Sequence, residues 1–410
     1  MKRVVITGMG LVSPLGDHVG NFWKALMNGT SGIEALSKLP SNQYRGNMLA
    51  AEVKWETEMY SPEFAAYSNA IQYAVKAARS SLTDAGLVIS TDKANNYGVI
   101  VGTTSGNQDM LERTLDTFDI VEEQQTFSQE AATMFAHVRP IELSAKVAQA
   151  CGFGGQNMVI STACAAGNYA IGTAFSMIQD GRTPIVVAGG SDSFTRSCYT
   201  IFYRLGGMTQ EDCRPFDKNR TGMVVGEGSA MLVLEDLDHA LARGAKIYCE
   251  VKGYSLTCDA YHRVAPDPNG GGASAAISKA IALSGLTIDD IDLISAHGTG
   301  TQANDAQEVN ALVSVFGDNL RDIPISGLKS MLGHCMGAAS ALEAIASVMS
   351  LNEQMIPPTI NTVEVDPHFS VAVDVIPQKG RSAPVQNVIS NAFGFGGNIC
   401  SIVLSRFNPN

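Results

Sequence analysis

The chain has 410 residues, of which 45% are hydrophobic and 17% are charged, where about 25% charged residues is usual. This much apolar material can offset the entropy lost on ordering, which excludes a disordered protein and suggests about two to three domain-sized units or one closely packed pair. The formal net charge of -12, without any basic run, argues against nucleic-acid binding.

Short β-branched apolar runs alternate with helical stretches along the whole chain, which predicts an α/β protein with buried strands. The first run begins like a signal peptide, but Gly8 and Gly10 interrupt it and no cleavage site follows, so we interpret it as a strand. In chain order, we expect strands at 3–7, 97–101, 157–161, 185–188, 230–235, 291–296 and 387–391, and helices at 65–85, 164–179, 272–284, 305–316 and 337–352.

Residues 147–179 carry no formal charge and are long enough to span a bilayer. The segment nevertheless contains glycines and several amide and hydroxyl side chains, which hydrocarbon would penalise. We therefore expect no membrane span here, but a strand and a helix buried inside the protein.

The eight cysteines form no CxxC pair and no regular spacing, so we expect a reducing compartment, the cytoplasm, and no disulfide framework. One of them, Cys164, follows the strand at 157–161 and begins the helix at 164–179. The amides and positive end of a helix favour an anion, which biases a thiol there toward the thiolate that attacks carbonyls. Cysteine is also a common buried residue, but the strand, small-residue turn and helix favour a nucleophile.

Two parts of the chain resemble each other, which indicates an internal duplication. Cys164 and His334 each follow a strand and come three residues before a glycine and an Ala-rich helix, so we expect them at the mouths of equivalent helices. The segments 97–106 and 291–300 also match, in the same order. We therefore predict two similar halves that meet near residue 250.

Two histidines are candidates for chemistry. His297 directly follows the strand at 291–296, and ligands bind at strand ends in α/β sheets. His334 lies at a helix start, where a cation is disfavoured, so we expect a neutral imidazole that donates one hydrogen bond. His297 could instead merely cap backbone groups, and residue type alone leaves a zinc site formed by Cys164, His297 and His334 open.

Lys329 and Glu343 lie in low-charge surroundings, which favours a buried pair over two ordinary solvated charges. Phe393 begins a glycine-rich segment whose backbone amides could hold an oxyanion, although such a segment can also be a simple turn. Asp305 and Glu308 have the spacing of a helix capping box, and we assign them a structural role.

Four motifs in a fixed order carry a resemblance to a known family; they are Ser-Thr-Ala-Cys at 161–164, His-Gly-Thr-Gly-Thr at 297–301, Lys-Ser-Met-Leu-Gly-His at 329–334, and Asn-Ala-Phe-Gly-Phe-Gly-Gly at 391–397. Over essentially its whole length, the chain resembles the β-ketoacyl-acyl carrier protein synthases, the elongating type II condensing enzymes of the thiolase superfamily. The resemblance implies a thiolase fold, with pseudo-duplicated halves at 1–250 and 251–410 in a five-layered αβαβα arrangement, and a dimer.

The resemblance also implies roles for the candidate residues. Cys164 would take the acyl chain as a thioester, His297 and His334 would serve decarboxylation of a malonyl extender, and Lys329 and Glu343 would form a supporting ionic network. The chemistry fits these residues, because loss of the carboxylate leaves an enolate whose oxygen needs two neutral donors.

By the same resemblance, the backbone amides of Cys164 and Phe393 would form the oxyanion hole, and the Phe393 ring would act as a gate over the cysteine. The implied partner is an acyl carrier protein that delivers acyl and malonyl groups on its own phosphopantetheine. Neither a metal nor a cofactor of the enzyme itself is implied.

Departures from the family pattern leave the pathway open. Residues 60–69 lack the basic side chains that help primary-metabolism members dock the acidic carrier, and Leu332, Ala392 and Asn398 replace a common threonine, serine and threonine. We predict a 3-oxoacyl-acyl carrier protein synthase, with the ketosynthase alpha subunit of a specialised type II polyketide or aryl polyene pathway as the alternative. That alternative would pair with a chain-length factor in place of a second identical chain. An acyl hydrolase or acyltransferase of thiolase type is the alternative from another class.

Overall fold

The computed structural model describes residues 1–40, 43–54, 62–88, 96–116 and 129–409. The helices are α1 Val19–Met27, α2 Asn69–Asp84, α3 Gln108–Asp116, α4 Gln129–Ala136, α5 Ile141–Cys151, α6 Ala166–Gln179, α7 Arg196–Arg204, α8 Leu237–Ala242, α9 Gly271–Ser284, α10 Gln302–Phe316, α11 Lys329–Leu332 and α12 Ala339–Glu353. The strands are β1 Val4–Val12, β2 Glu34–Ala35, β3 Leu49–Ala50, β4 Gly98–Gly102, β5 Asn157–Ile160, β6 Ile185–Asp192, β7 Gly228–Asp236, β8 Cys249–Cys258, β9 Leu293–Ser295, β10 Pro324–Ser326, β11 Met355–Ile356, β12 Asp374–Val375, β13 Arg381–Ser382, β14 Asn387–Gly394 and β15 Asn398–Arg406.

Within the described residues, the main sheet has 11 strands in the order β12-β10-β9-β14-β15-β8-β1-β7-β6-β4-β5. β1 and β8 meet in its middle, and outward from them β7, β6, β4 and β5 mirror β15, β14, β9 and β10. The two inner pairings on each side are antiparallel and the two outer pairings are parallel. The predicted duplication is therefore confirmed by the topology, although the boundary at residue 250 stays a prediction.

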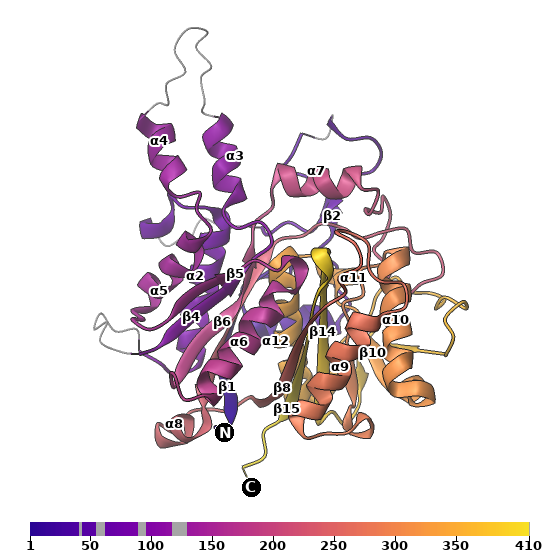
Figure 1. Cartoon of the computed structure of the whole chain (residues 1–410). Coiled ribbons are helices and arrows are strands. Elements are labelled where there is room, and N and C mark those ends of the chain that lie inside the picture. Colours follow the sequence, from indigo (N-terminus) through magenta and orange to yellow (C-terminus); the bar gives the residue numbers. More distant parts are fainter. Residues whose placement is uncertain (41–42, 55–61, 89–95, 117–128, 410) are drawn as a thin grey trace.

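Helices cover both faces of each half-sheet, as the predicted αβαβα layers require. The side chains of β6 alternate between two cores, because Val186 and Ala188 face the central helices whereas Ile185 and Val187 face α2 and α5. On the other half, α9 and α10 pack on β9 and β14. Figure 1 shows the two halves side by side, with α6 and α12 in the middle. The α/β class and the five layers are thus confirmed.

The first strand is longer than predicted. We expected it to end at residue 7, because glycines normally weaken a strand, but β1 continues to Val12. A Cβ atom at Gly8 would lie 2.2 Å from the Ser81 carbonyl oxygen, and one at Gly10 would lie 2.1 Å from the Ala77 oxygen. The two glycines therefore let α2 pack directly on the strand.

The uncharged segment forms part of α5, β5 and α6, and α6 is buried along most of its length. Within the described ranges, no helix combines the length and the apolar character needed to cross a membrane. The expected strands omitted β8, which joins the halves by pairing with β1, and its neighbour β15. Both strands carry partly exposed or polar side chains. The helix expected at 65–85 begins at Asn69, because the Ser68 side chain caps it by accepting a hydrogen bond from the Ile71 amide.

Candidate active site

The candidate residues from both halves line one cavity of about 320 Å³. Cys164, His297, His334 and Phe393 all contribute to its wall. Mostly apolar side chains surround them, including Phe202, Leu205, Met223, Val264, Phe395 and Ile399. The structure therefore brings together the thiol, both imidazoles and the aromatic ring that the sequence motifs singled out.

Cys164 lies in a short 3-10 turn, Ala163–Ala165, that leads into α6. The end of β14 lies against this turn, because a Cβ atom at Gly394 would be 3.2 Å from the Cys164 amide nitrogen. The backbone around Phe393 and the Cys164 amide therefore border the same point in the cavity.

The Cys164 side chain is only 4% exposed. Burial raises the pKa of its thiol to about 12, although the positive charge of Lys329 opposes the rise. The expected bias toward a resting thiolate is therefore wrong. Loss of hydration outweighs the favourable influence of the turn and the nearby cation.

The turns before α6 and α12 are structural equivalents, but not in the predicted register. The second turn is Met336–Ala338, and its first residue, Met336, has φ 52° where Ala163 has φ 51°. Cys164 therefore corresponds to Gly337, whereas the glycine spacing predicted His334. His334 precedes the turn and reaches the cavity from the segment that leads into it.

Both imidazoles line the cavity, and burial favours their neutral form. The backbone amide of Met336 donates to Nδ1 of His334 at 3.2 Å, which leaves the proton on Nε2. The two imidazole rings lie 5.5 Å apart at 82°. Burial, followed by the charge of Lys329, holds the pKa of both histidines well below its usual value. The expectation of a neutral His334 is confirmed, with burial as its main cause.

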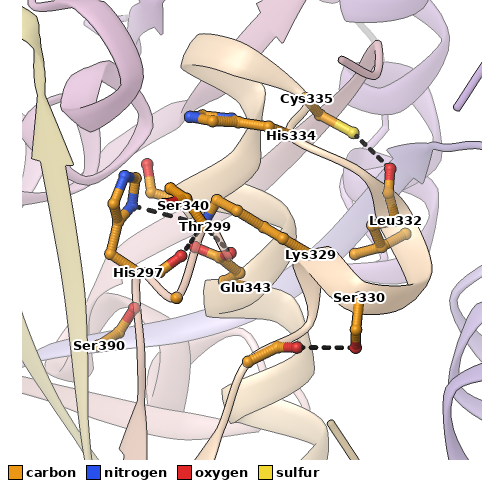
Figure 2. Close-up of polar contacts among 12 residues, drawn as sticks. His297, Thr299, Lys329, Ser330, Leu332, His334, Cys335, Ser340, Glu343 and Ser390 are labelled. Atoms are coloured by element: carbon orange, nitrogen blue, oxygen red, sulfur yellow. Dashed lines mark hydrogen bonds and ion pairs between the residues drawn. The ribbon is translucent and has the colours of Figure 1, made fainter. Parts of the chain in front are cut away.

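Lys329 and Glu343 form the buried pair that their surroundings predicted. Lys329 is 1% exposed, and its Nζ lies 2.6 Å from Oε1 of Glu343. The same ammonium donates to the backbone oxygen of His297 at 2.5 Å and lies 3.4 Å from Nδ1 of that residue. Burial raises the pKa of Glu343 to about 7, against the opposing effect of Lys329. Figure 2 shows Lys329 lying between His297 and Glu343.

Asp305 and Glu308, to which we assigned a structural role, form no capping box. Thr301 caps α10, which begins three residues earlier than expected. Glu308 instead accepts hydrogen bonds from the backbone amides of His297 and Gly298, both at 2.8 Å. Asp305 accepts one from the Gly300 amide at 3.2 Å. The two acids therefore hold the loop that carries His297, a contact that helix spacing could not indicate.

The three replaced family positions lie beside the site. Leu332 and Ala392 are buried, and the Asn398 side chain donates to the Phe395 oxygen at 2.9 Å, which closes the glycine-rich turn. The segment at 60–69, which lacks the usual basic residues, falls partly outside the described residues, so the carrier docking surface stays a prediction.

Across the described part of the chain, no three His, Cys, Asp or Glu side chains gather in the manner of metal ligands. Cys164, His297 and His334 share the cavity wall without forming such a group. The zinc site that residue type left open therefore has no support from their arrangement.

Comparison with known proteins bears on the whole chain. The models of the Beta-ketoacyl synthase N-terminal and C-terminal domains match residues 1–240 and 248–363. The 3-oxoacyl-[acyl-carrier-protein] synthase 2 of Synechocystis sp. (strain ATCC 27184 / PCC 6803 / Kazusa) is 36% identical over 99% of this chain and 98% of its own length. The protein of the same name from Staphylococcus aureus (strain COL) is 34% identical over 99% of each chain.

Two solved structures match this chain along their full length. The ishigamide ketosynthase/chain length factor superposes with a TM-score of 0.93 at 37% identity, covering 99% of this chain and 100% of its own. AntDE:AntF is described as a type II PKS acyl-carrier protein in complex with its ketosynthase bound to the hexaketide. It superposes with a TM-score of 0.90 at 30% identity, covering 99% of this chain and 100% of its own.

Proposed function

The chain belongs to the β-ketoacyl synthase family, and we propose from this that it is a 3-oxoacyl-acyl carrier protein synthase whose condensation occurs in the cavity around Cys164. One observation carries the proposal: a thiol and two neutral imidazoles, drawn from both halves of the chain, line the same cavity. The reaction is a decarboxylative Claisen condensation of a malonyl group with an acyl group.

In the first step, Sγ of Cys164 attacks the thioester carbonyl of an acyl carrier protein. The carbonyl carbon gains a bond to Sγ and loses its bond to the carrier sulfur, which leaves with the thiol proton. The oxyanion formed in between would be held by the amides of Cys164 and Phe393. The contact of Gly394 with the Cys164 turn supports this pairing of backbone amides.

In the second step, a malonyl thioester enters and loses its carboxylate as carbon dioxide. The electron pair of the broken bond moves into an enolate, whose oxygen accepts hydrogen bonds from Nε2 of His334 and of His297. Two donors of neutral imidazole suit this purpose, because they stabilise developing charge without quenching the carbanion with a full proton. The low pKa of both histidines supports this role.

In the third step, the enolate carbon attacks the acyl thioester on Cys164, and the sulfur leaves as a thiolate. This thiolate then takes up a proton from water, which restores the resting thiol, and the high pKa of the buried thiol favours that protonation. Both reactants are held in one cavity, so the step is effectively unimolecular. Each step balances in atoms and electrons without a cofactor.

The proposed enzyme elongates acyl chains, and a second candidate function follows from the solved relatives. The match to a ketosynthase/chain length factor at 37% identity supports the alpha subunit of a specialised type II polyketide or polyene pathway. In that case the partner chain would be a chain-length factor, and otherwise a second copy of this chain. The family matches that end at 240 and begin at 248 support halves at 1–250 and 251–410. The eight free cysteines support a reducing, cytoplasmic location.

The reaction can be tested by mass spectrometry. Purified protein is mixed with acyl and malonyl carrier protein, and a chain lengthened by two carbons is expected. Free acid without elongation would overturn the proposal and favour the hydrolase. Cys164→Ala should abolish the acyl-enzyme adduct, whereas Cys258→Ala, which changes the exposed cysteine, should retain it. Co-purification with the proteins encoded nearby tests the pathway, because a bound homologue without the active cysteine would favour the specialised reading.

A further inference from the structure

Asp192, at the end of β6, is a buried acid that the reaction described above does not use. Its Oδ1 accepts hydrogen bonds from the Thr103 hydroxyl and the Ser105 amide, both at 2.8 Å. Its Oδ2 accepts from the amides of Thr104 and Gly337, both at 2.7 Å. Four donors therefore converge on a carboxylate that is 0% exposed. Three of them are backbone amides, so they form a nest for an anion.

The position of this nest is set by the internal duplication. Gly337 occupies the place in its turn that Cys164 occupies in the other. The Cys164 turn lies against the end of β14, and the Gly337 turn lies against the end of β6. A Cβ atom at Gly337 would lie only 2.6 Å from Oδ2 of Asp192. The amide that corresponds to that of Cys164 thus already binds an anion, supplied by the protein itself.

The hydrogen bond between Gly337 and Asp192 is connected to His334 by two adjacent backbone amides. The Met336 amide donates to Nδ1 of His334, and the next amide, that of Gly337, donates to Asp192. Met336 has a positive φ of 52°, a conformation that costs energy in a residue other than glycine and needs support from its surroundings. Asp192 supplies such support from the other half of the chain, 145 residues away.

We propose that Asp192 is a positioning residue, which holds the turn behind His334 against the end of β6 and so sets the place of the His334 imidazole relative to Cys164. The inference rests on the proposed role of His334 in decarboxylation. Without the carboxylate, the amides of Thr104, Ser105 and Gly337 lose their shared acceptor, so the turn loses this attachment to the end of β6.

A purely structural role and a positioning role differ in what they do to Cys164. The charge of Asp192 raises the pKa of the Cys164 thiol, in addition to the effect of burial. The other charged groups that act on this thiol are Lys329, which lowers its pKa, and Glu343, which raises it. Removal of Asp192 should therefore make the thiol more reactive while it slows decarboxylation. General loss of structure would lower both rates.

The test compares Asp192→Ala and Asp192→Asn with Asp236→Asn. Asp236 is a suitable control because it is also buried and accepts hydrogen bonds from two backbone amides. It lies at the start of α8 and does not line the cavity. Carbon dioxide release from malonyl carrier protein measures decarboxylation, and iodoacetamide labelling followed by mass measures the thiol. A shift of about 1 Å in a catalytic group costs roughly 100-fold in rate. Asp192→Ala should lose about this factor in decarboxylation, with faster labelling of Cys164.

Added sodium formate should restore part of the decarboxylation rate in Asp192→Ala, because the emptied nest can accept a small carboxylate. It should not change Asp236→Asn. If the alanine variant does not fold, Asp192→Asn keeps the shape of the side chain and should still lose roughly 10-fold, since one of its two atoms can no longer accept hydrogen bonds.

Several results would overturn the inference. Decarboxylation within twofold of wild type in a folded Asp192→Ala protein would do so, as would equal losses in decarboxylation and labelling, or no response to formate. A wild-type protein that releases no carbon dioxide would instead overturn the proposed function, and with it the role of His334. The two failures are therefore distinguishable.

Discussion

Replacement of Gly394 by alanine should move β14 away from the turn that carries Cys164. The added Cβ would lie 2.9 Å from the Thr162 oxygen, whereas ordinary contact begins at 3.4 Å. The distance between β14 and the Cys164 turn must therefore increase by about 0.5 Å. This is half of the displacement of about 1 Å that lowers a reaction rate roughly 100-fold. Gly394 has φ -134° and ψ 157°, which alanine adopts readily, so backbone strain does not contribute. We expect about a 10-fold slower acylation of Cys164, equivalent to about 1.4 kcal/mol.

The assay is single-turnover formation of the acyl-enzyme adduct, followed by mass. Decarboxylation of malonyl carrier protein in the same variant should fall less, because its donors are the histidines and not these amides. Gly20→Ala in α1 is the matched control, since its Cβ would meet only the His18 ring at an ordinary 3.4 Å. Acylation within twofold of wild type in a folded Gly394→Ala protein would refute the reasoning that places the oxyanion hole between β14 and the Cys164 turn.

Four further predictions follow from the charges in the site. The rate of Cys164 alkylation should rise about tenfold per pH unit from pH 7 to 9, because burial raises the pKa of the thiol to about 12; a plateau in this range would indicate a thiolate. His297→Ala and His334→Ala should still form the acyl adduct but lose roughly 100-fold or more in carbon dioxide release, and normal release would remove their assigned role. Because the folded pKa of both histidines lies below the usual 6.5, the rate of carbon dioxide release should show no histidine titration near pH 6.5, and a rate that halves near that pH would contradict this expectation. The contribution of the two histidines to folding stability is full above pH 6.5 and is lost as the pH falls through their folded pKa. Lys329→Met leaves Glu343 buried without its cation and should lower the free energy of unfolding in urea by about 3–5 kcal/mol, most of which the double variant with Glu343→Leu should recover; an unchanged urea midpoint would show that the pair does not stabilise the fold.

Much of the fold and of the candidate site could be predicted from patterns within short stretches of the sequence. Strands buried on both faces, such as β4 and β6, begin with short apolar runs, and the alternation of such runs with helical stretches indicates an α/β fold. The matching segments 97–106 and 291–300 indicate the duplication. The candidate residues Cys164 and His297 each follow such a strand, so the sequence already placed them at strand ends where ligands bind. The neutral state of His334 was likewise predicted, although from its place at a helix start, whereas burial is its main cause in the structure.

The tertiary structure alone decided the features that depend on residues far apart in the chain. Asp192 and Gly337 meet across 145 positions, and Glu308 binds the loop before its own helix, so no local spacing indicates either contact. The protonated state of Cys164 also follows from packing, because five stacked layers remove the water that a thiolate needs. Close packing of α2 on Gly8 likewise explains why β1 continues where the local pattern predicted an end. Hydration and the distance between helix and strand are set by the assembled layers, which is why they cannot be obtained from a single segment.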